Sequence, residues 1–215
     1  MTLAPPRTLR KRERTRGELL AAAERLVAVN GLDAISIDDI TEEADVAKGT
    51  FYTHFEDKDH LASAIGKSIR LELEEKITAT NAGVTDAAVR MANGLSSMFA
   101  FTIAQPIRAR ALIRLIPGAV DPDEPINAGI KGDVALGHKT KRFAGASLNA
   151  AVVATLGIAM SAGMRLSDAK HRVGDPYAFA TEILATALVA LGLKQTEAAR
   201  LAKTAMDARR QEAKP

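Results

Sequence analysis

The sequence predicts an all-α protein, and three observations carry this prediction. Apolar residues recur at helical spacing through almost the whole chain, whereas the alternation that marks strands is scarce. Aromatic residues make up 4% of the chain while alanine is abundant, a composition that favours helices over sheets. The 215 residues, 47% hydrophobic and 26% charged, suffice for one or two domains with a sizeable core.

Composition also excludes several classes of protein. The chain has no cysteine, which excludes disulfide scaffolds, thiolate metal sites and cysteine nucleophiles and suits a reducing compartment. The basic segment 1–16 is followed by no apolar run, so we do not interpret it as a secretory signal. Residues 143–164 are uncharged over nearly a bilayer's length but contain polar residues and glycines, which favours a buried helix. We therefore expect a cytoplasmic protein that has no membrane partner.

The first half of the chain carries clear helix boundaries. A helix over 15–29 should end at the left-handed stop Asn30-Gly31, and a short helix should begin at Ser36, with Asp39 completing a capping box. The helical pattern breaks at Asp45 and resumes over 47–55, and a long helix follows over 57–79. Further helices are expected at 85–104, 106–116, 140–165, 176–191 and 196–211, with an irregular loop over 117–132.

The stretch 36–61 has the layout of a helix-turn-helix: two short helices, a tight turn, and a supporting helix on either side. One small core can form from Ile37, Ile40, Ala44, Val46, Phe51, Phe55 and Leu61. The residues left to face outward are Lys48, Gly49, Thr50, Tyr52, Thr53 and His54. A lysine and a glycine at a helix start allow close approach to base edges, and the hydroxyl and imidazole groups can bond phosphates.

The segment VAKGTFYTHFEDKDHL, over 46–61, closely resembles the recognition-helix signature of the TetR family of bacterial transcriptional regulators. The resemblance covers about a quarter of the chain. It implies Lys48 and Gly49 near bases, and phosphate contacts from Ser36, Thr50, Tyr52, His54 and Lys58, with the amide of Ala47 close by. It also implies a homodimer on a palindromic operator, released by a small-molecule effector. The family usually has glycine where this chain has Asp45, and because aspartate tolerates the left-handed conformation we expect the turn to be kept.

Charge is distributed unevenly over this N-terminal region. Residues 36–60 hold eight acids and two lysines, a net charge of −6, whereas residues 1–16 hold six basic residues and one acid, a net charge of +5. We expect the basic segment to offset the acids by following the DNA backbone. The predicted organisation is a flexible basic arm over 1–14, a helix-turn-helix domain over 15–61, and a larger helical effector-binding and dimerisation domain over 62–215.

The larger domain offers weaker signals. Residues that share or flank one helical face, and that form either core or a ligand pocket, are Met91, Leu95, Met98, Phe99 and Thr102. Arg110 and Arg114 lie in a region without Asp or Glu. They either form a solvated basic face or bind an anionic ligand at the mouth of the pocket. Segments 140–165 and 176–191 are candidates for the dimer interface. The residues that suggest it are Gly145, Ala146, Gly157, Ala159, Gly163, Leu184, Leu188 and Leu191.

Catalysis finds little support in the sequence. The four histidines are scattered, and none lies four residues from another as a helical zinc pair requires. In GDVALGHKT, His138 separates the glycine and lysine that a phosphate-binding loop needs side by side. We therefore expect no enzyme, no catalytic residue, no cofactor and no metal. A helical small-molecule-binding dimer that has lost DNA binding stays open as an alternative.

Overall fold

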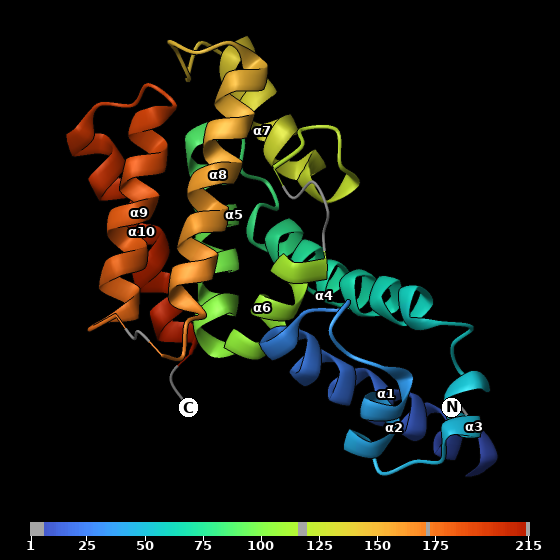
Figure 1. Cartoon of the computed structure of the whole chain (residues 1–215). Helices are drawn as coiled ribbons and strands as arrows, with labels where there is room; N and C mark the ends of the chain where they lie inside the picture. Colours follow the sequence, from blue (N-terminus) through green and yellow to red (C-terminus); the bar gives the residue numbers. More distant parts are fainter. Residues whose placement is uncertain (1–6, 116–119, 171–172, 214–215) are drawn as a thin grey trace.

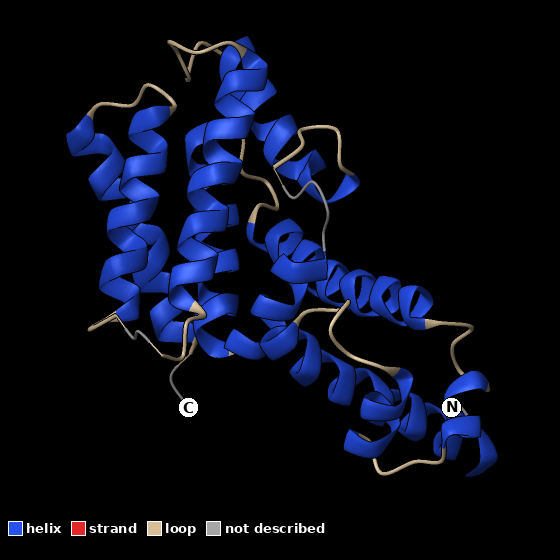
Figure 2. Ribbon diagram, viewed as in Figure 1, coloured by secondary structure: helices blue, strands red, loops and turns tan. Residues whose placement is uncertain are grey.

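The computed structural model describes residues 7–115, 120–170 and 173–213, and these residues form ten α-helices and one 3₁₀ turn, with no strand among them (Figures 1 and 2). The N-terminal helices are α1 (Arg7–Asn30), α2 (Ile37–Glu43), α3 (Lys48–Tyr52) and α4 (Lys58–Thr80). The remaining elements are α5 (Ala87–Ala104), α6 (Pro106–Leu115), the turn η1 (Pro125–Asn127), α7 (Ala128–Lys139), α8 (Leu148–Leu166), α9 (Pro176–Ala190) and α10 (Gln195–Glu212). The all-α prediction is confirmed.

Three boundaries differ from the sequence prediction, namely the starts of α1, α7 and α8. Helix α1 begins at Arg7, so residues 7–14 are helical where a flexible arm was expected, and residues 1–6 lie outside the described part. The expected loop over 117–132 and helix over 140–165 are also partly wrong, because α7 already begins at Ala128 and α8 only at Leu148. Pro125 opens a short turn that leads directly into α7, so the loop is shorter than the glycines and prolines suggest.

Local capping explains how the N-terminal helices are delimited. Ser36 accepts a hydrogen bond from the backbone N–H of Asp39, and the Asp39 carboxylate accepts one from the backbone N–H of Ser36 at 2.7 Å, which completes the capping box at the start of α2. Asp57 caps α4 by accepting from the N–H of His60. Gly31 ends α1 with a φ of 86°, the left-handed conformation that a glycine adopts without strain. These caps fix where α1 ends and where α2 and α4 begin.

The C-terminal domain is built around α5, which packs against α4, α6, α7, α8, α9 and α10. Its core includes Met91, Leu95 and Phe99 of α5 together with Leu184 and Leu188 of α9, all essentially inaccessible to solvent. Helix α8 is long and apolar enough to cross a membrane, with a mean hydropathy of 1.3. In this fold, however, α8 packs against α5, α6, α7 and α9, as expected of a core helix of a bundle.

Helices α4 and α6 join the two domains. Helix α4 begins in the N-terminal core with Leu61 and Ile65 and continues to the C-terminal domain, as Figure 1 shows. Helix α6 packs along α1, where the Arg108 guanidinium lies 3.3 Å from the Glu24 carboxylate and 2.7 Å from that of Glu72 on α4. The hydrogen bond from Arg108 lowers the pKa of Glu72, whereas burial raises the pKa of Glu24. The N-terminal domain is thus joined to the C-terminal domain in two ways, through the continuous helix α4 and through the packing of α6 against α1.

Candidate DNA-binding surface and ligand cavity

Helix α3 is oriented by two buried rings. The Phe51 and Phe55 side chains are inaccessible to solvent, their ring centroids lie 5.7 Å apart, and both belong to the core that α1, α2 and α4 complete. Tyr52 packs edge-on against Phe51 with its side chain 53% exposed. Because a helix of one and a half turns has little room to rotate once Phe51 is buried, Lys48 and Tyr52 must face solvent.

The structure leaves most of the predicted DNA-contacting residues exposed to solvent. Those that are exposed are Ser36, Ala47, Lys48, Gly49, Tyr52 and Thr53, while Thr50 and His54 are half-buried. A Cβ built on Gly49 meets nothing within 4 Å, so the backbone of the first turn of α3 is open to close approach. The Thr53 hydroxyl donates to the Thr50 carbonyl at 2.7 Å. We call this set of residues the α3 surface.

The turn between α2 and α3 is kept without the usual glycine. Asp45 adopts a φ of 52°, the left-handed conformation expected of it, and its side chain is exposed. The backbone N–H of Val46 closes the turn by donating to the Thr41 carbonyl at 3.0 Å. The prediction that aspartate preserves this turn is confirmed.

Half of the acids in residues 36–60 have structural partners. Asp38 holds the Lys48 ammonium at 2.8 Å, Asp39 belongs to the α2 capping box, Glu43 accepts from Arg25 at 2.7 Å, and Asp57 caps α4. The hydrogen bond that Lys48 donates to Asp38 raises the pKa of Lys48. Their charges are therefore partly neutralised within the domain, but Lys48 must leave a carboxylate before it can contact DNA.

Lys58 faces inward more than the sequence predicts. Its ammonium donates to the carbonyls of Leu32 and Ile35, at 3.2 and 2.6 Å, and thereby fixes the loop between α1 and α2. The side chain is half-buried. Its evident role in this structure is to position α2, and a phosphate contact would be additional to that role.

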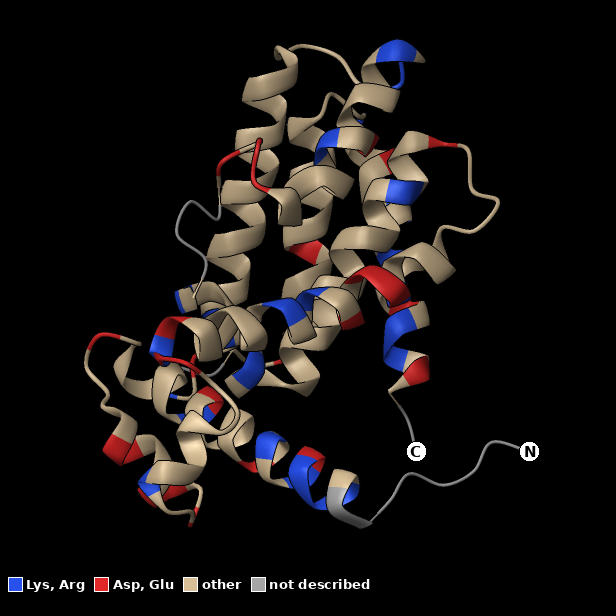
Figure 3. Cartoon of the chain, turned by 90° about the vertical axis from the view of Figure 1, so that its right-hand side faces the viewer, with Lys and Arg blue, Asp and Glu red and all other residues tan. Residues whose placement is uncertain are grey.

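The N-terminal turns of α1 add a basic segment beside α3. The Arg16 guanidinium lies 5.0 Å from the centroid of the Phe55 ring, and Arg10, Lys11 and Arg12 are exposed on the turns before it. Burial, and then the charges of Arg12 and Arg16, lower the pKa of His54. Figure 3 shows the basic residues of α1 close to its free end. The basic residues that sequence analysis placed in a flexible arm are thus largely on a helix next to the α3 surface.

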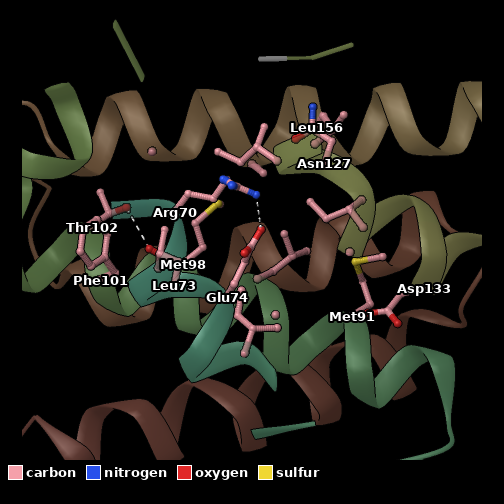
Figure 4. Close-up of a pocket in the computed structure, with 18 of the residues that line it drawn as sticks. Arg70, Leu73, Glu74, Met91, Met98, Phe101, Thr102, Asn127, Asp133 and Leu156 are labelled. Carbon is pink, nitrogen blue, oxygen red and sulfur yellow. Dashed lines mark hydrogen bonds and ion pairs between the residues drawn. The ribbon is translucent and has the colours of Figure 1, made fainter. Parts of the chain in front are cut away.

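A second site lies in the C-terminal domain, where α4, α5, α6, α7 and α8 enclose a cavity of about 490 Å³ (Figure 4). Small-molecule sites span roughly 300–1,000 Å³. Met91, Leu95, Met98 and Thr102 of α5 line the cavity. Of the two alternatives for this helical face, core or ligand pocket, these four residues fit the pocket. Polar residues that sequence analysis missed also line it, namely Arg70, Glu74, Asn81, Arg90, Asn127 and Asp133.

Three residues proposed for the pocket lie elsewhere. Phe99 flanks the cavity-lining face of α5 and is buried in the core instead of lining the cavity. Arg110 donates to the Ser167 carbonyl at the end of α8, with the Asp168 carboxylate 3.9 Å away. Arg114 donates to the carbonyls of Val27 and Val29 at the end of α1, at 3.3 and 3.0 Å. Both arginines bind carbonyls near helix C-termini, where the helix dipole favours a cation, and neither lines the cavity.

The expected dimer segments are only partly free to form an interface. Ala159, Gly163, Leu184, Leu188 and Leu191 are buried within the chain's own core, so their assignment to a contact between copies is not supported. Gly145 and Ala146 are exposed before α8, and Gly157 is half-buried. Along α8, uncharged residues that are exposed or half-exposed form a strip that ends beside the exposed Arg165. We call this strip the α8 face: Ala150, Val153, Ala154, Gly157, Ser161 and Met164.

Comparison with known proteins agrees with this geometry. Residues 19–65 match the family of bacterial regulatory proteins, tetR family. A relative in Bacillus subtilis strain 168, an uncharacterized HTH-type transcriptional regulator named YvdT, is 40% identical over 52 residues, which span 24% of this chain and 27% of that protein. The shared segment is thus about a quarter of either chain.

Two solved structures share the fold over most of the chain. A regulatory protein of the tetR family from Rhodococcus RHA1 has a TM-score of 0.69 at 19% identity, covering 84% of this chain and 98% of that one. RolR in complex with resorcinol has a TM-score of 0.58 at 23% identity, covering 90% and 95%. Residues 19–65 thus carry a helix-turn-helix of the tetR family of bacterial regulatory proteins, and most of the chain shares its fold with a solved regulator of that family.

Proposed function

We propose that the chain is a cytoplasmic homodimeric repressor that binds a palindromic DNA operator and leaves it when a small molecule fills the cavity. The observation that carries the proposal is the α3 surface. Burial of Phe51 and Phe55 turns Lys48, Gly49 and Tyr52 outward beside the basic end of α1, as docking into a major groove requires. The interface is then compatible with DNA in spite of the acids around it.

Two copies of the chain satisfy the geometry of a palindrome. Half-sites one helical turn apart lie about 34–36 Å from one another, so two recognition helices must be held at that spacing. The α8 face offers the surface for pairing, because it is uncharged and Val153 and Met164 are 44% and 51% exposed. Its alanines and glycine let two helices approach closely.

The cavity is placed where a ligand can act on the DNA-binding domain. Both α4 and α6 line it, and both contact α1. A ligand that favours one arrangement of these helices would therefore change the separation of the two α3 surfaces in a dimer, and so the fit to both half-sites. That RolR was solved with resorcinol supports a small-molecule effector for this chain.

An electrophoretic mobility assay with the DNA upstream of the chain's own gene tests the proposal. Sequence-specific retardation is expected, and Lys48→Ala should relax the base preference while leaving salt-sensitive nonspecific binding. If the intact dimer binds the upstream DNA no better than a scrambled duplex, DNA binding by the α3 surface is wrong. The chain would then be a ligand-binding dimer without a DNA function.

The Asp38–Lys48 ion pair leads to a prediction about affinity. Because the Lys48 ammonium must leave Asp38 to contact DNA, Asp38→Asn should tighten operator binding about two- to fivefold, in proportion to the modest strength of an exposed ion pair. Fluorescence anisotropy with a labelled operator measures this change. Asp59→Asn removes the same charge from the same region and is the matched control. An equal gain in both variants would show a general charge effect instead.

His54 leads to a prediction about pH. Burial and the nearby Arg12 and Arg16 lower its pKa below the usual 6.5, so the free protein holds it neutral at pH 7. A bound phosphate favours the imidazolium, so a proton is taken up on binding and operator affinity should rise as pH falls from about 7.5 to 5.5. His54→Gln should flatten this rise in an anisotropy titration, whereas His138→Gln should not. An unchanged slope in His54→Gln would refute the contact.

A further inference from the structure

Two ion pairs interrupt the otherwise mostly apolar lining of the cavity. The Arg70 guanidinium lies 3.0 Å from the Glu74 carboxylate, one turn further along α4. The Arg90 guanidinium lies 2.6 Å from the Asp133 carboxylate and joins α5 to α7. A charged ligand that enters this space finds its oppositely charged partners in these pairs.

The two pairs differ in how readily they can open. Arg90 also donates to the Val84 carbonyl, and the Asp133 side chain is only 12% exposed, so separating them would pull two helices apart and bury a carboxylate without a partner. Arg70 and Glu74 belong to a single helix, and their side chains are 31% and 46% exposed. The Arg70–Glu74 pair can therefore exchange partners without rearranging the fold.

Arg70 has spare hydrogen-bonding capacity inside the cavity. Figure 4 shows its side chain reaching into the cavity, with Met98 beside it and a single bond to Glu74. A guanidinium carries a planar set of N–H donors that matches the two oxygens of a carboxylate. Within the described residues, the Arg70 guanidinium donates one hydrogen bond, from a single nitrogen to the Glu74 carboxylate. The remaining donors are available to a ligand.

The sign of the ligand's charge follows from which member of the Arg70–Glu74 pair a ligand can displace. An incoming carboxylate would replace Glu74, the more exposed of the two, which can turn toward water. An incoming cation would have to displace the Arg70 guanidinium, which would be left against apolar side chains without its partner. The exchange is therefore favourable for an anion and unfavourable for a cation.

We propose that the effector is an amphipathic carboxylic acid whose carboxylate binds Arg70 and whose apolar body lies along Leu95, Met98 and Leu156. This proposal rests on the proposed function, because it names the chemistry of the effector in the same cavity. It also explains how the head group is sensed. Arg70 lies on α4, the helix that begins in the DNA-binding domain, so a bond formed there acts on that helix directly.

Calorimetric titration with three probes of equal chain length tests the proposal on the full-length protein: decanoate, 1-decanol and decylamine. Decanoate should bind the wild type most tightly. Arg70→Met should weaken decanoate about tenfold or more while leaving 1-decanol unchanged, as expected for loss of a charge-assisted hydrogen bond. Glu74→Gln should strengthen decanoate, because the competing carboxylate is gone. Lys67→Met, an exposed cation on the same helix outside the cavity, should bind decanoate as the wild type does.

Several outcomes would overturn the proposal. Unchanged decanoate affinity in Arg70→Met would remove Arg70 as the ligand's partner, and tighter binding of decylamine than of decanoate would assign the site to cations. Failure of all three probes to bind would exclude an amphiphile of this class. Operator binding, measured on the same samples without probes, reports on the proposed DNA function separately. If the protein still binds the operator but does not prefer decanoate over the other two probes, this inference is wrong and the proposed DNA function is unaffected.

Discussion

An arginine placed at Gly157 is expected to convert the dimer to a monomer and to reduce operator affinity by at least about 100-fold. A Cβ at this position meets nothing within 4 Å in the chain itself, so a side chain can leave the backbone there without a clash at its first atom. In a dimer paired through the α8 face, however, two arginines would be forced into an uncharged contact, where unpaired charge is costly. A monomer contacts only one half-site. It therefore loses the gain in operator affinity that comes from two linked contacts, which is typically about 10²–10⁴-fold.

Sedimentation equilibrium measures the assembly state, and a mobility assay measures the affinity. Gly132→Arg is the matched control, because a Cβ at this helical glycine of α7 also meets nothing within 4 Å and Gly132 is not part of the α8 face. It should leave both quantities unchanged. If Gly157→Arg remains a dimer with normal affinity, the two copies pair through another surface.

Neutralising the N-terminal turns of α1 should have the second large effect. Replacing Arg10, Lys11 and Arg12 by glutamine removes three charges from a helical segment beside the α3 surface. For every phosphate that no longer meets a cation, the slope of log affinity against log salt should become shallower by about 0.9, so the decrease in affinity is largest at low salt. We expect a decrease of about 100-fold or more near 50 mM salt. Glutamine preserves helix propensity, so the segment should stay folded.

Anisotropy titrations between low and high salt check this prediction. A control in which Lys139, Lys194 and Arg200 become glutamine changes the net charge equally on exposed positions of the other domain. Its slope and affinity should match the wild type. Equal slopes in the two triple variants would mean that the basic end of α1 does not reach the DNA backbone, and that the α3 surface supplies the phosphate contacts alone.

Most of the N-terminal domain could be predicted because its signals are local. The caps Ser36 and Asp57, the stop at Gly31 and the left-handed Asp45 each act within a few residues. The start of α1 was missed because residues 7–14 have no apolar stripe. They continue a helix already nucleated by the buried face that includes Leu19, and extending a helix needs only weak propensity.

The cavity could not be predicted to the same extent because its walls come from five helices. Arg70 and Glu74 are four residues apart, the spacing of an ordinary solvent-exposed ion pair. Asp133 lies in α7, and the glycines at the start of that helix suggested a loop. Arg110 and Arg114 show the opposite error. Their partners are backbone carbonyls at the ends of α8 and α1, and no pattern of side chains in the sequence indicates such acceptors.

The acids around α3 have a consequence for how such a regulator searches a chromosome. Phosphates are alike at every position, so Glu42, Asp45 and their neighbours weaken contact with all duplexes equally, whereas base contacts are made at the target alone. Occupancy in a cell depends on the ratio of target affinity to that of the millions of competing sites. Carboxylates around the recognition helix would therefore shorten each visit to a nonspecific sequence and leave discrimination to the few side chains that read bases.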